Sequence, residues 1–258
     1  MNNLFLRVLS ALVMLPAAVA LILFGGWPYV GVVILLSILV LQEWNMITTG
    51  KWLSPLFVVQ AAGLLALGVV LNLYHEFSFV YVAIYLAAVL AVSLGTGNGY
   101  KLAFAGALYA LLPALSLIWL REFIPGGAYI ILWSMITTWS MDTGAYFAGR
   151  RIGGPKMSPR ISPNKTWAGL IGGALLALVT GTMSAEYFGF APLFQYAAVA
   201  VLLAIWSQIG DLAESALKRK FNVKDSGAII PGHGGIMDRV DGILFVMPVV
   251  ALFLFFGA

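Results

Sequence analysis

The sequence contains no cysteine and only two histidines, His75 and His233. Disulfide bonds and thiolate metal sites are therefore excluded, and a zinc site built from several histidines is disfavoured. Charged residues make up 9% of the chain, whereas an ordinary soluble domain has about 25%. The patterns GxxxxGK[ST], HExxH and GxSxG are also absent. A P-loop, a zinc metalloprotease and an α/β-hydrolase are therefore not supported.

Hydrophobic residues make up 62% of the 258 residues, and the mean hydropathy is +0.98. A helix needs about 20 apolar residues to cross a bilayer, and turn-forming residues separate segments of that kind. We therefore predict an all-α, polytopic integral membrane protein with about nine transmembrane helices, the first of them a retained helix and not a cleaved signal sequence. The predicted spans are 4–24, 28–47, 55–73, 78–97, 102–120, 127–148, 167–185, 190–210 and 242–257.

The distribution of basic residues predicts the topology. Loop 149–166 has five Lys or Arg residues and no acidic residue, and loop 211–241 is also rich in basic residues. Two predicted helices lie between these loops, so both loops face the same side, which the positive-inside rule makes cytoplasmic. Counting back places the N-terminus in the cytoplasm. We expect a single helical domain over 1–258, with N-terminal helices over 1–120 and a polar, functional part over 127–257.

The most polar stretch of the chain is SALKRKFNVKDSGAIIPGHGGIMDRVD, at 215–241. Charged groups are costly near a bilayer, so such a cluster indicates a functional site. Lysine and arginine suit phosphate groups, and aspartate oxygens suit Mg²⁺. The glycines around His233 allow backbone N–H groups to approach an anion closely. The composition of this stretch therefore favours chemistry on phosphates with a divalent cation.

Several polar residues outside this stretch extend the candidate site. Asp211, Glu214, Ser215 and Lys218 have the spacing of one helical face. Asp238 and Asp241 share a face if the last helix begins near them. Loop 149–166 is stiffened by Pro159 and Pro163, and Thr166 or Asn164 can cap the helix that follows. Asp142 needs a cation or hydrogen-bond partners if it is buried, whereas Glu43 suits an interfacial position as well as a functional one.

The stretch 215–241 resembles the signature of the phosphatidate cytidylyltransferase family, also called CDP-diacylglycerol synthases. The matching pattern is S-x-L-K-R, K-D-x-G, P-x-H-G-G and D-R-x-D in that order. An earlier run, from Asp142 to Thr166, is also similar to the family. Ala168 departs from the pattern, because relatives often have Glu or Gln there. The strong resemblance covers about 142–241, and the N-terminal helices match the family in hydropathy only.

The resemblance implies an enzyme of phospholipid biosynthesis, a nucleotidyltransferase that couples CTP with phosphatidic acid to give CDP-diacylglycerol and pyrophosphate. The lipid phosphate would attack the α-phosphorus of CTP in line, assisted by Mg²⁺, and a second cation would be compatible with the family. The implied catalytic residues are Asp211, Asp238, Lys218, Arg239 and His233. The implied metal ligands are Asp211, Asp238 and Asp241. The implied substrate-binding residues are Lys165, Ser162, Asn164, Ser215, Arg219, Lys224, Asp225, Gly234, Gly235 and Asp142. His233 would either donate to a phosphate oxygen or order the glycine-rich turn.

The absence of cysteine and the compact size suit a bacterial inner-membrane protein in contact with the lipid bilayer, and the positive-inside rule predicts that its site faces the cytoplasm. A homodimer is compatible with the family, and no nucleic-acid partner is expected. A secondary transporter for an anionic, phosphate-bearing substrate is a candidate from another functional class, because a basic cavity would serve it too. A CTP-dependent lipid kinase and a lipid-binding scaffold without turnover are two further candidates. The D-G-x2-A-R pattern of enzymes that handle CDP-activated alcohols is absent.

Overall fold

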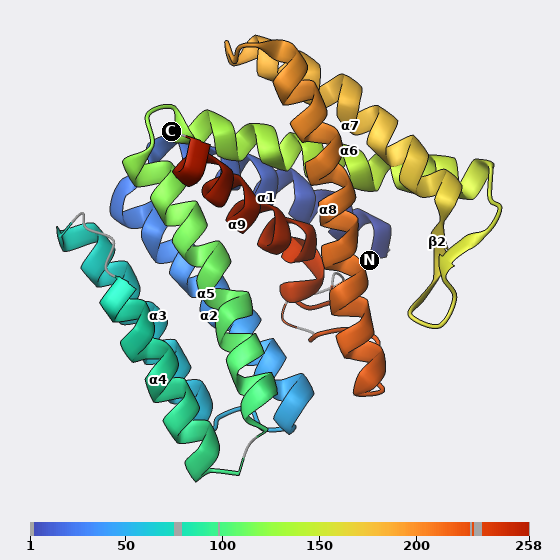
Figure 1. Cartoon of the computed structure of the whole chain (residues 1–258). Coiled ribbons are helices and arrows are strands. Elements are labelled where there is room, and N and C mark those ends of the chain that lie inside the picture. The colour runs from blue at the N-terminus through green and yellow to red at the C-terminus, as the bar shows by residue number, and fades with distance from the viewer. Residues whose placement is uncertain (1–2, 75–78, 98, 228, 230–233, 258) are drawn as a thin grey trace. The chain divides into compact units, whose positions relative to one another are not determined.

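The computed structural model describes residues 3–74, 79–97, 99–227, 229 and 234–257. These residues form nine helices and one two-stranded hairpin (Figure 1). The helices are α1 (Asn3–Phe24), α2 (Gly26–Thr49), α3 (Pro55–Tyr74), α4 (Phe79–Gly95), α5 (Tyr100–Phe123), α6 (Gly127–Arg151), α7 (Trp167–Tyr187), α8 (Leu193–Lys220) and α9 (Met237–Gly257). The strands are β1 (Lys156–Ser158) and β2 (Ser162–Thr166).

Each predicted span coincides with one helix, so the all-α prediction is confirmed. Two helices extend well beyond one end of their predicted spans. Helix α8 continues past 210 to Lys220, because its last turn carries three basic residues that favour the negative end of the helix dipole. Helix α9 begins at Met237 and not at 242, with Asp238 in its first turn, where a carboxylate favours the positive end.

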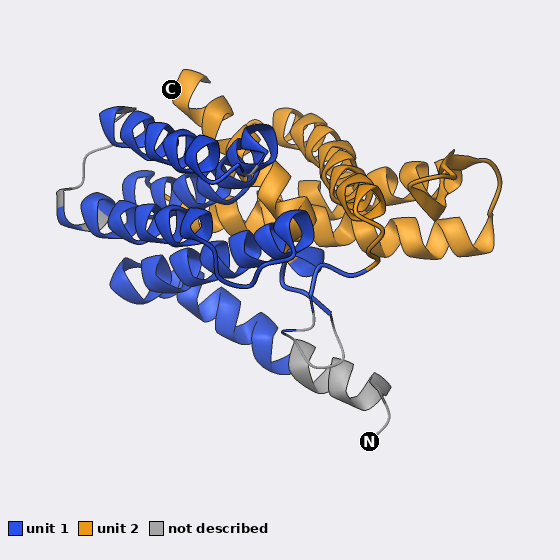
Figure 2. Ribbon diagram, turned by 90° about the horizontal axis from the view of Figure 1, so that it is seen from below, with its two compact units in different colours: residues 1–125, 225–239 blue, residues 126–224, 240–258 orange. Residues whose placement is uncertain are grey.

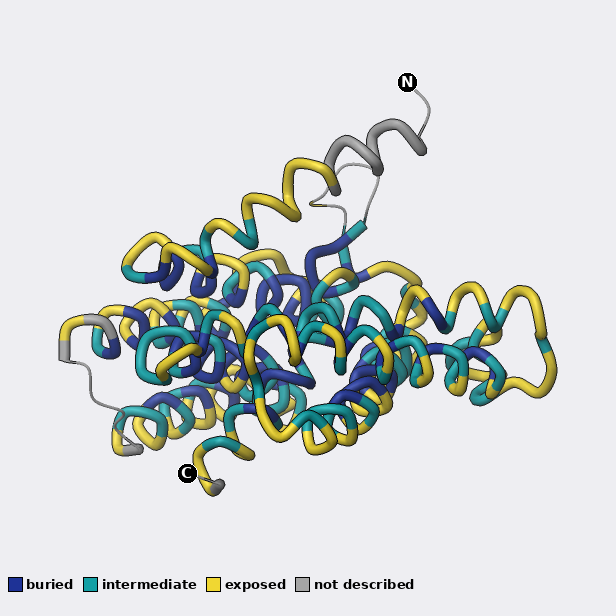
Figure 3. The backbone as a smooth tube through the Cα atoms, turned by 90° about the horizontal axis from the view of Figure 1, so that it is seen from above, coloured by how far each residue is buried: buried dark blue, intermediate teal, exposed yellow. Residues whose placement is uncertain are grey.

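Long apolar helices make this an integral membrane protein. Five helices of the described residues are long and apolar enough to cross a membrane, namely α2, α5, α7, α8 and α9. Shorter apolar stretches are Leu12–Phe24, Pro55–Leu71 and Val80–Gly95. Large hydrophobic side chains are exposed on most helices, and Figure 3 colours the exposed residues along the backbone yellow. Exposed apolar surface of this kind suits lipid chains. The count of nine spans stays a prediction.

The chain forms two compact units (Figure 2). Unit 1 contains Met1–Pro125 and Asp225–Arg239, and unit 2 contains Gly126–Lys224 and Val240–Ala258. Helix α9 therefore begins in unit 1 and continues in unit 2. The expected division into N-terminal helices over 1–120 and a functional part over 127–257 stays a prediction.

In unit 1, α2 packs against α3 and α5. Polar side chains between these helices satisfy one another. Trp44 Nε1 donates to the Leu102 carbonyl at 3.0 Å, and Asn45 Nδ2 donates to Gln60 Oε1 at 2.8 Å. Gln60 Nε2 in turn donates to the Ala103 carbonyl at 3.0 Å. These bonds remove the cost of burying amides and indole in an apolar bundle.

In unit 2, α6 and α7 pack closely along small residues. A Cβ placed on Gly173 would lie 2.5 Å from the Met141 carbonyl oxygen and 2.6 Å from Met141 Sδ. Met141 is fully buried with Ala177 and Ala204. Trp133 Nε1 donates to the Gly181 carbonyl at 2.8 Å and ties the same helices together. The close approach of the backbones thus depends on residues without a side chain.

Gly173→Ala is expected to destabilise the protein by about 1–3 kcal/mol, because the added methyl group overpacks the α6–α7 contact. Thermal unfolding in detergent, followed by circular dichroism, measures this change. Gly31→Ala is the matched control on a helix, since a Cβ there meets nothing within 4 Å. Equal melting temperatures for the two variants would contradict the prediction.

Loop 149–166 is more ordered than its sequence alone indicates, because it contains the hairpin β1–β2. The strands are antiparallel, with Lys156 opposite Thr166 and Ser158 opposite Ser162. The turn is closed by the Ile161 N–H, which donates to the Ser158 carbonyl at 3.2 Å. Pro159 occupies the second position of this turn, where its fixed φ is favourable. Thr166 then caps α7 by accepting from the Gly169 N–H at 3.1 Å, as predicted.

Candidate active site

A polar cavity of about 360 Å³ lies within unit 2. Four elements contribute to its wall: α6, the hairpin, the start of α7 and the middle of α8. The lining residues are Asp142, Ala145, Tyr146, Met157, Ser162, Asn164, Lys165, Thr166, Gly169, Leu170, Gln208 and Asp211. Residues separated by up to 69 positions therefore meet in one hollow (211 − 142 = 69).

An ion pair between the hairpin and α8 crosses this cavity. Lys165 Nζ lies 2.6 Å from Asp211 Oδ2, and the exposed fractions of the two side chains are 15% and 32%. Because both groups are largely withdrawn from water, their attraction is screened less than that of a surface pair. Asp211 also accepts a hydrogen bond from Ser215 Oγ at 3.3 Å, one turn further along α8. The pair thus fixes the hairpin against the helix.

A second contact holds Asp142 in place. Gln208 Nε2 donates to Asp142 Oδ1 at 3.0 Å, and the Gln208 side chain is buried. The Asp142 carboxylate repels Asp211 and is attracted by Lys165. The expectation that Asp142 needs partners is therefore met by an amide and an ammonium group. With two carboxylates and one ammonium, these cavity residues carry one negative charge in excess.

Asp241, in the second turn of α9, adds another carboxylate to this electrostatic environment. It repels both Asp211 and Asp142 and is attracted by Lys165. Its Oδ1 accepts a hydrogen bond from the Gly242 N–H at 2.8 Å. Oxygen donors with an excess of negative charge are the chemistry that Mg²⁺ prefers. The residues of unit 2 therefore fit a hard divalent cation in charge and donor type.

The described carboxylates do not form a cluster that could bind a metal ion. Among the residues that the structure describes, no three acidic or histidine side chains lie close enough to hold a metal ion together. Asp238 belongs to unit 1, where its Oδ2 accepts from the backbone N–H groups of Ser226 at 2.9 Å and Gly235 at 3.2 Å. Binding of Mg²⁺ by Asp211, Asp238 and Asp241 stays a prediction.

The rest of the polar face of α8 lies beyond the cavity. Lys218 Nζ forms an ion pair with Glu214 Oε1 at 2.9 Å, and the exposed fractions of these side chains are 12% and 1%. Arg219 donates to the carbonyls of Ile161, at 3.3 Å, and Val223, at 3.0 Å. The shared face was predicted, and the structure adds that Lys218 is held by a buried carboxylate. Arg219 supports the hairpin turn.

The structure brings together five of the predicted site residues in the cavity. They are Asp142, Ser162, Asn164, Lys165 and Asp211. The remaining described residues lie outside its wall: Ser215, Lys218, Arg219, Lys224 and Asp241 in unit 2, and Asp225, Gly234, Gly235, Asp238 and Arg239 in unit 1. The side chains of Lys224, Asp225 and Arg239 are exposed. His233 lies outside the described residues.

Among the lining residues that the predicted site omitted, Gln208 and Tyr146 have polar side chains, and the sequence contains a signal for each. Gln208 precedes Asp211 by three positions and Tyr146 follows Asp142 by four, so each shares a helical face with a predicted residue. The Tyr146 hydroxyl accepts a hydrogen bond from Arg150 Nη1 at 2.7 Å. This contact places a guanidinium beside the cavity.

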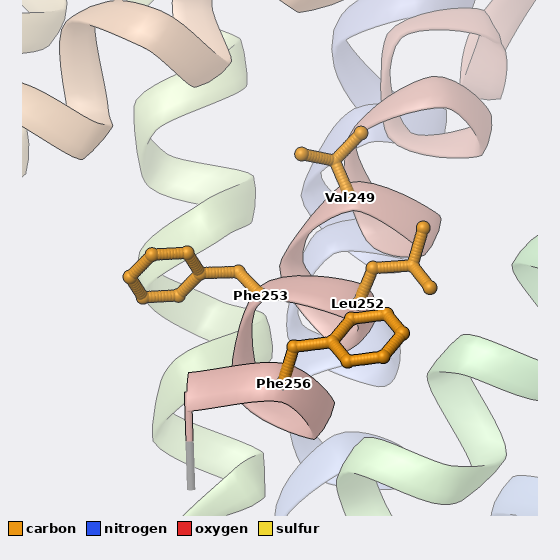
Figure 4. Close-up of a pocket in the computed structure, with 4 residues that line it drawn as sticks. All are labelled: Val249, Leu252, Phe253 and Phe256. Carbon is orange, nitrogen blue, oxygen red and sulfur yellow. The ribbon is translucent and has the colours of Figure 1, made fainter.

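A second hollow, of about 490 Å³, lies on α9 and has a different character (Figure 4). It is lined by Val249, Leu252, Phe253 and Phe256, all from one helix. No lining side chain can form a hydrogen bond, so the hollow suits lipid chains and cannot bind phosphate groups. The cavity of unit 2 is the better candidate for chemistry.

Comparison with known proteins agrees with this assignment. The model of the cytidylyltransferase family matches residues 5–256. The chain belongs to the cytidylyltransferase family. A phosphatidate cytidylyltransferase of Brucella suis biovar 1 is 37% identical over 255 residues, which cover 98% of this chain and 94% of the relative. The enzyme of the same name from Staphylococcus saprophyticus is 32% identical over 259 residues, or 96% of this chain and 98% of the relative.

A third relative is similar over a shorter stretch. The phosphatidate cytidylyltransferase of Bacillus subtilis is 47% identical over 123 residues, which cover 47% of this chain and 46% of the relative. Family membership accounts for both the apolar helices and the polar cavity, since a cytidylyltransferase of lipids must handle a soluble nucleotide at a membrane. It also confirms the resemblance found from the sequence motif.

Proposed function

We propose that this protein transfers the cytidylyl group of CTP to phosphatidic acid and forms CDP-diacylglycerol and pyrophosphate. The observation that carries the proposal is the polar cavity with the Lys165–Asp211 ion pair, within a family whose similar members have this activity in their names. The cavity combines an ammonium group for phosphate with carboxylates for a cation. Its position in an apolar chain suits one soluble and one lipid substrate.

In the proposed reaction, a phosphate oxygen of phosphatidic acid attacks the α-phosphorus of CTP. The bond from that phosphorus to the bridging oxygen of the β-phosphate breaks, and pyrophosphate leaves with the electron pair. The attacking phosphate is already anionic near neutral pH, so no strong general base is needed. Catalysis then depends on in-line positioning and on neutralising charge.

The cavity residues have separate roles in this proposal. Lys165 binds phosphate oxygens as a point charge, and Ser162 and Asn164 on the same strand donate hydrogen bonds. Gln208 holds Asp142 in one orientation through its amide. Asp211, with Asp238 and Asp241, would hold Mg²⁺. When bound, Mg²⁺ supplies positive charge to the triphosphate and to the pyrophosphate leaving group.

The distribution of basic residues supports a location in the bacterial inner membrane with the site on the cytoplasmic side. Basic residues gather in 149–166 and 211–241, and the positive-inside rule places both segments in the cytoplasm. CTP is soluble and phosphatidic acid is not, so a site at the cytoplasmic face of a bacterial inner membrane serves both. We also propose that the protein contacts the lipid bilayer and forms a homodimer.

The proposal predicts pyrophosphate release by purified protein in detergent, but only with CTP, phosphatidic acid and Mg²⁺ together. Removing Mg²⁺ with EDTA is expected to lower the rate by at least about 100-fold, since charge neutralisation is the main catalytic contribution. ATP in place of CTP and omission of lipid are the controls. Lipid phosphorylation without pyrophosphate would indicate a kinase, and transport without turnover would indicate a secondary transporter.

A further inference from the structure

Glu43 is a buried carboxylate that the proposed chemistry does not use. It lies on α2 in unit 1, and its side chain is 1% exposed. Neither of the two ion pairs among the described residues includes it. A buried carboxylate without a positive partner is unfavourable unless hydrogen bonds replace its hydration. This burial argues against a Glu43 side chain that extends into water, which the sequence had left open.

Hydrogen bonds from the loop before α9 satisfy both oxygens of Glu43. Ser226 Oγ donates to Oε2 at 2.7 Å. The backbone N–H of Ile236 donates to Oε1 at 2.9 Å, and that of Met237 donates to Oε2 at 2.9 Å. The last two donors lie at the start of α9, where N–H groups lack partners within the helix and favour an anion. Glu43 thus caps a helix that is distant in the sequence.

Two glycines let the loop close around this carboxylate. A Cβ on Gly227 would lie 2.7 Å from Glu43 Oε1. A Cβ on Gly235 would overlap Ser226 Oγ and would lie 2.6 Å from Glu43 Oε2. Any side chain at either position would push the loop away from α2. The close packing against Glu43 therefore explains why glycine occupies these two motif positions, without any contact to a phosphate.

The same loop also binds the side chain of Asp238, the residue that follows Met237 in α9. Asp238 Oδ2 accepts from the backbone N–H groups of Ser226 and Gly235. Ser226 therefore donates its hydroxyl to Glu43 and its N–H to Asp238. The two carboxylates therefore bind the same residue through different groups. A shift of Ser226 away from Glu43 would displace the Asp238 carboxylate as well.

We infer that Glu43 is a positioning residue that fixes the start of α9 and, through Ser226, sets the place of Asp238. The inference rests on the proposed function, in which Asp238 is one of the ligands of Mg²⁺. Glu43 itself touches no substrate in this scheme. Its effect is expected on turnover and on the concentration of Mg²⁺ that is needed, and not on the binding of CTP.

Glu43→Gln tests this inference, because it preserves the side-chain shape but places an NH₂ group against a backbone donor. We expect kcat to fall by at least about 10-fold and the half-saturating Mg²⁺ concentration to rise, with little change in KM for CTP, as for other residues that orient metal ligands. Ser226→Ala is expected to shift both in the same direction. Ser37→Ala is the matched control, since this buried α2 hydroxyl donates to the Val33 carbonyl of its own helix.

The mobility of a spin label can be measured without any enzymatic activity, so it tests the role of Glu43 independently of the proposed function. The chain has no cysteine, so Ile229→Cys, at an exposed loop position, can carry a single nitroxide spin label. Glu43→Gln and Ser226→Ala are each expected to increase the label mobility, and Ser37→Ala is not. Unchanged mobility in Glu43→Gln would overturn the inference, as would unchanged kcat and Mg²⁺ dependence in an active enzyme. If the wild type forms no CDP-diacylglycerol, the proposed function fails and the label still decides the role of Glu43.

Discussion

Asp211→Asn should reduce pyrophosphate release by about 1,000-fold or more while the protein stays folded. The substitution preserves shape but removes the charge that holds Lys165 at 2.6 Å. An amide is also a much poorer ligand for Mg²⁺ than a carboxylate. Both the phosphate-binding ammonium and the proposed cation therefore lose their anchor in one step. Initial rates at saturating CTP and phosphatidic acid measure the effect.

Glu186→Gln is the matched control for this substitution. Glu186 is an exposed carboxylate in the last turn of α7, in the same unit but outside the cavity. We expect the Glu186→Gln variant to release pyrophosphate at the same rate as the wild type. Similar melting temperatures for Asp211→Asn and the wild type would show that the loss is chemical. A rate for Asp211→Asn above about a tenth of the wild-type value would remove Asp211 from the active site.

Lys165→Met should lower kcat/KM for CTP by about 100-fold or more. The substitution leaves Asp142 and Asp211 facing the cavity without their shared counter-charge, so the negative triphosphate would meet two carboxylates and no ammonium. Lys165→Arg is expected to recover part of the activity, because it restores the charge but replaces a compact ammonium with a wide planar group. Rates measured over a range of CTP concentrations separate binding from turnover.

Lys156→Met provides the comparison for Lys165→Met. Lys156 lies on the other strand of the same hairpin, and its side chain is exposed and outside the cavity wall. A loss of activity in both variants would indicate that general surface charge attracts CTP. Loss in Lys165→Met alone is the result expected from a specific contact in the cavity.

Periodicity and apolar length were sufficient to predict the helices, because each span must satisfy its own backbone within the bilayer. The face from Asp211 to Lys218 could also be predicted, since helical spacing is local. The hairpin was not predicted, although the Ser158–Pro159 turn signal is present, because its strands are short and paired only with each other. Short elements of this kind have weak patterns.

The contacts that define the cavity are of a different kind. Lys165 meets Asp211 across 46 positions (211 − 165 = 46), and Gln208 meets Asp142 across 66. A single sequence indicates that each of these residues needs a partner, but it does not indicate which one. The same holds for Glu43, because two of its three donors are backbone N–H groups and therefore have no signature in the sequence.

The separation between Glu43 and its donors has a consequence for biogenesis. Ile236 follows Glu43 by 193 positions, and a chain is synthesised from its N-terminus. Helix α2 therefore enters the membrane with an acidic side chain long before its hydrogen-bond donors have left the ribosome. Until then the Glu43 carboxylate must stay in contact with water, since an anion without hydrogen-bond partners is too costly to bury. A nascent chain that stops before Ile236 cannot complete this contact, so Glu43 can fix the start of α9 only after Ile236 and Met237 have been synthesised.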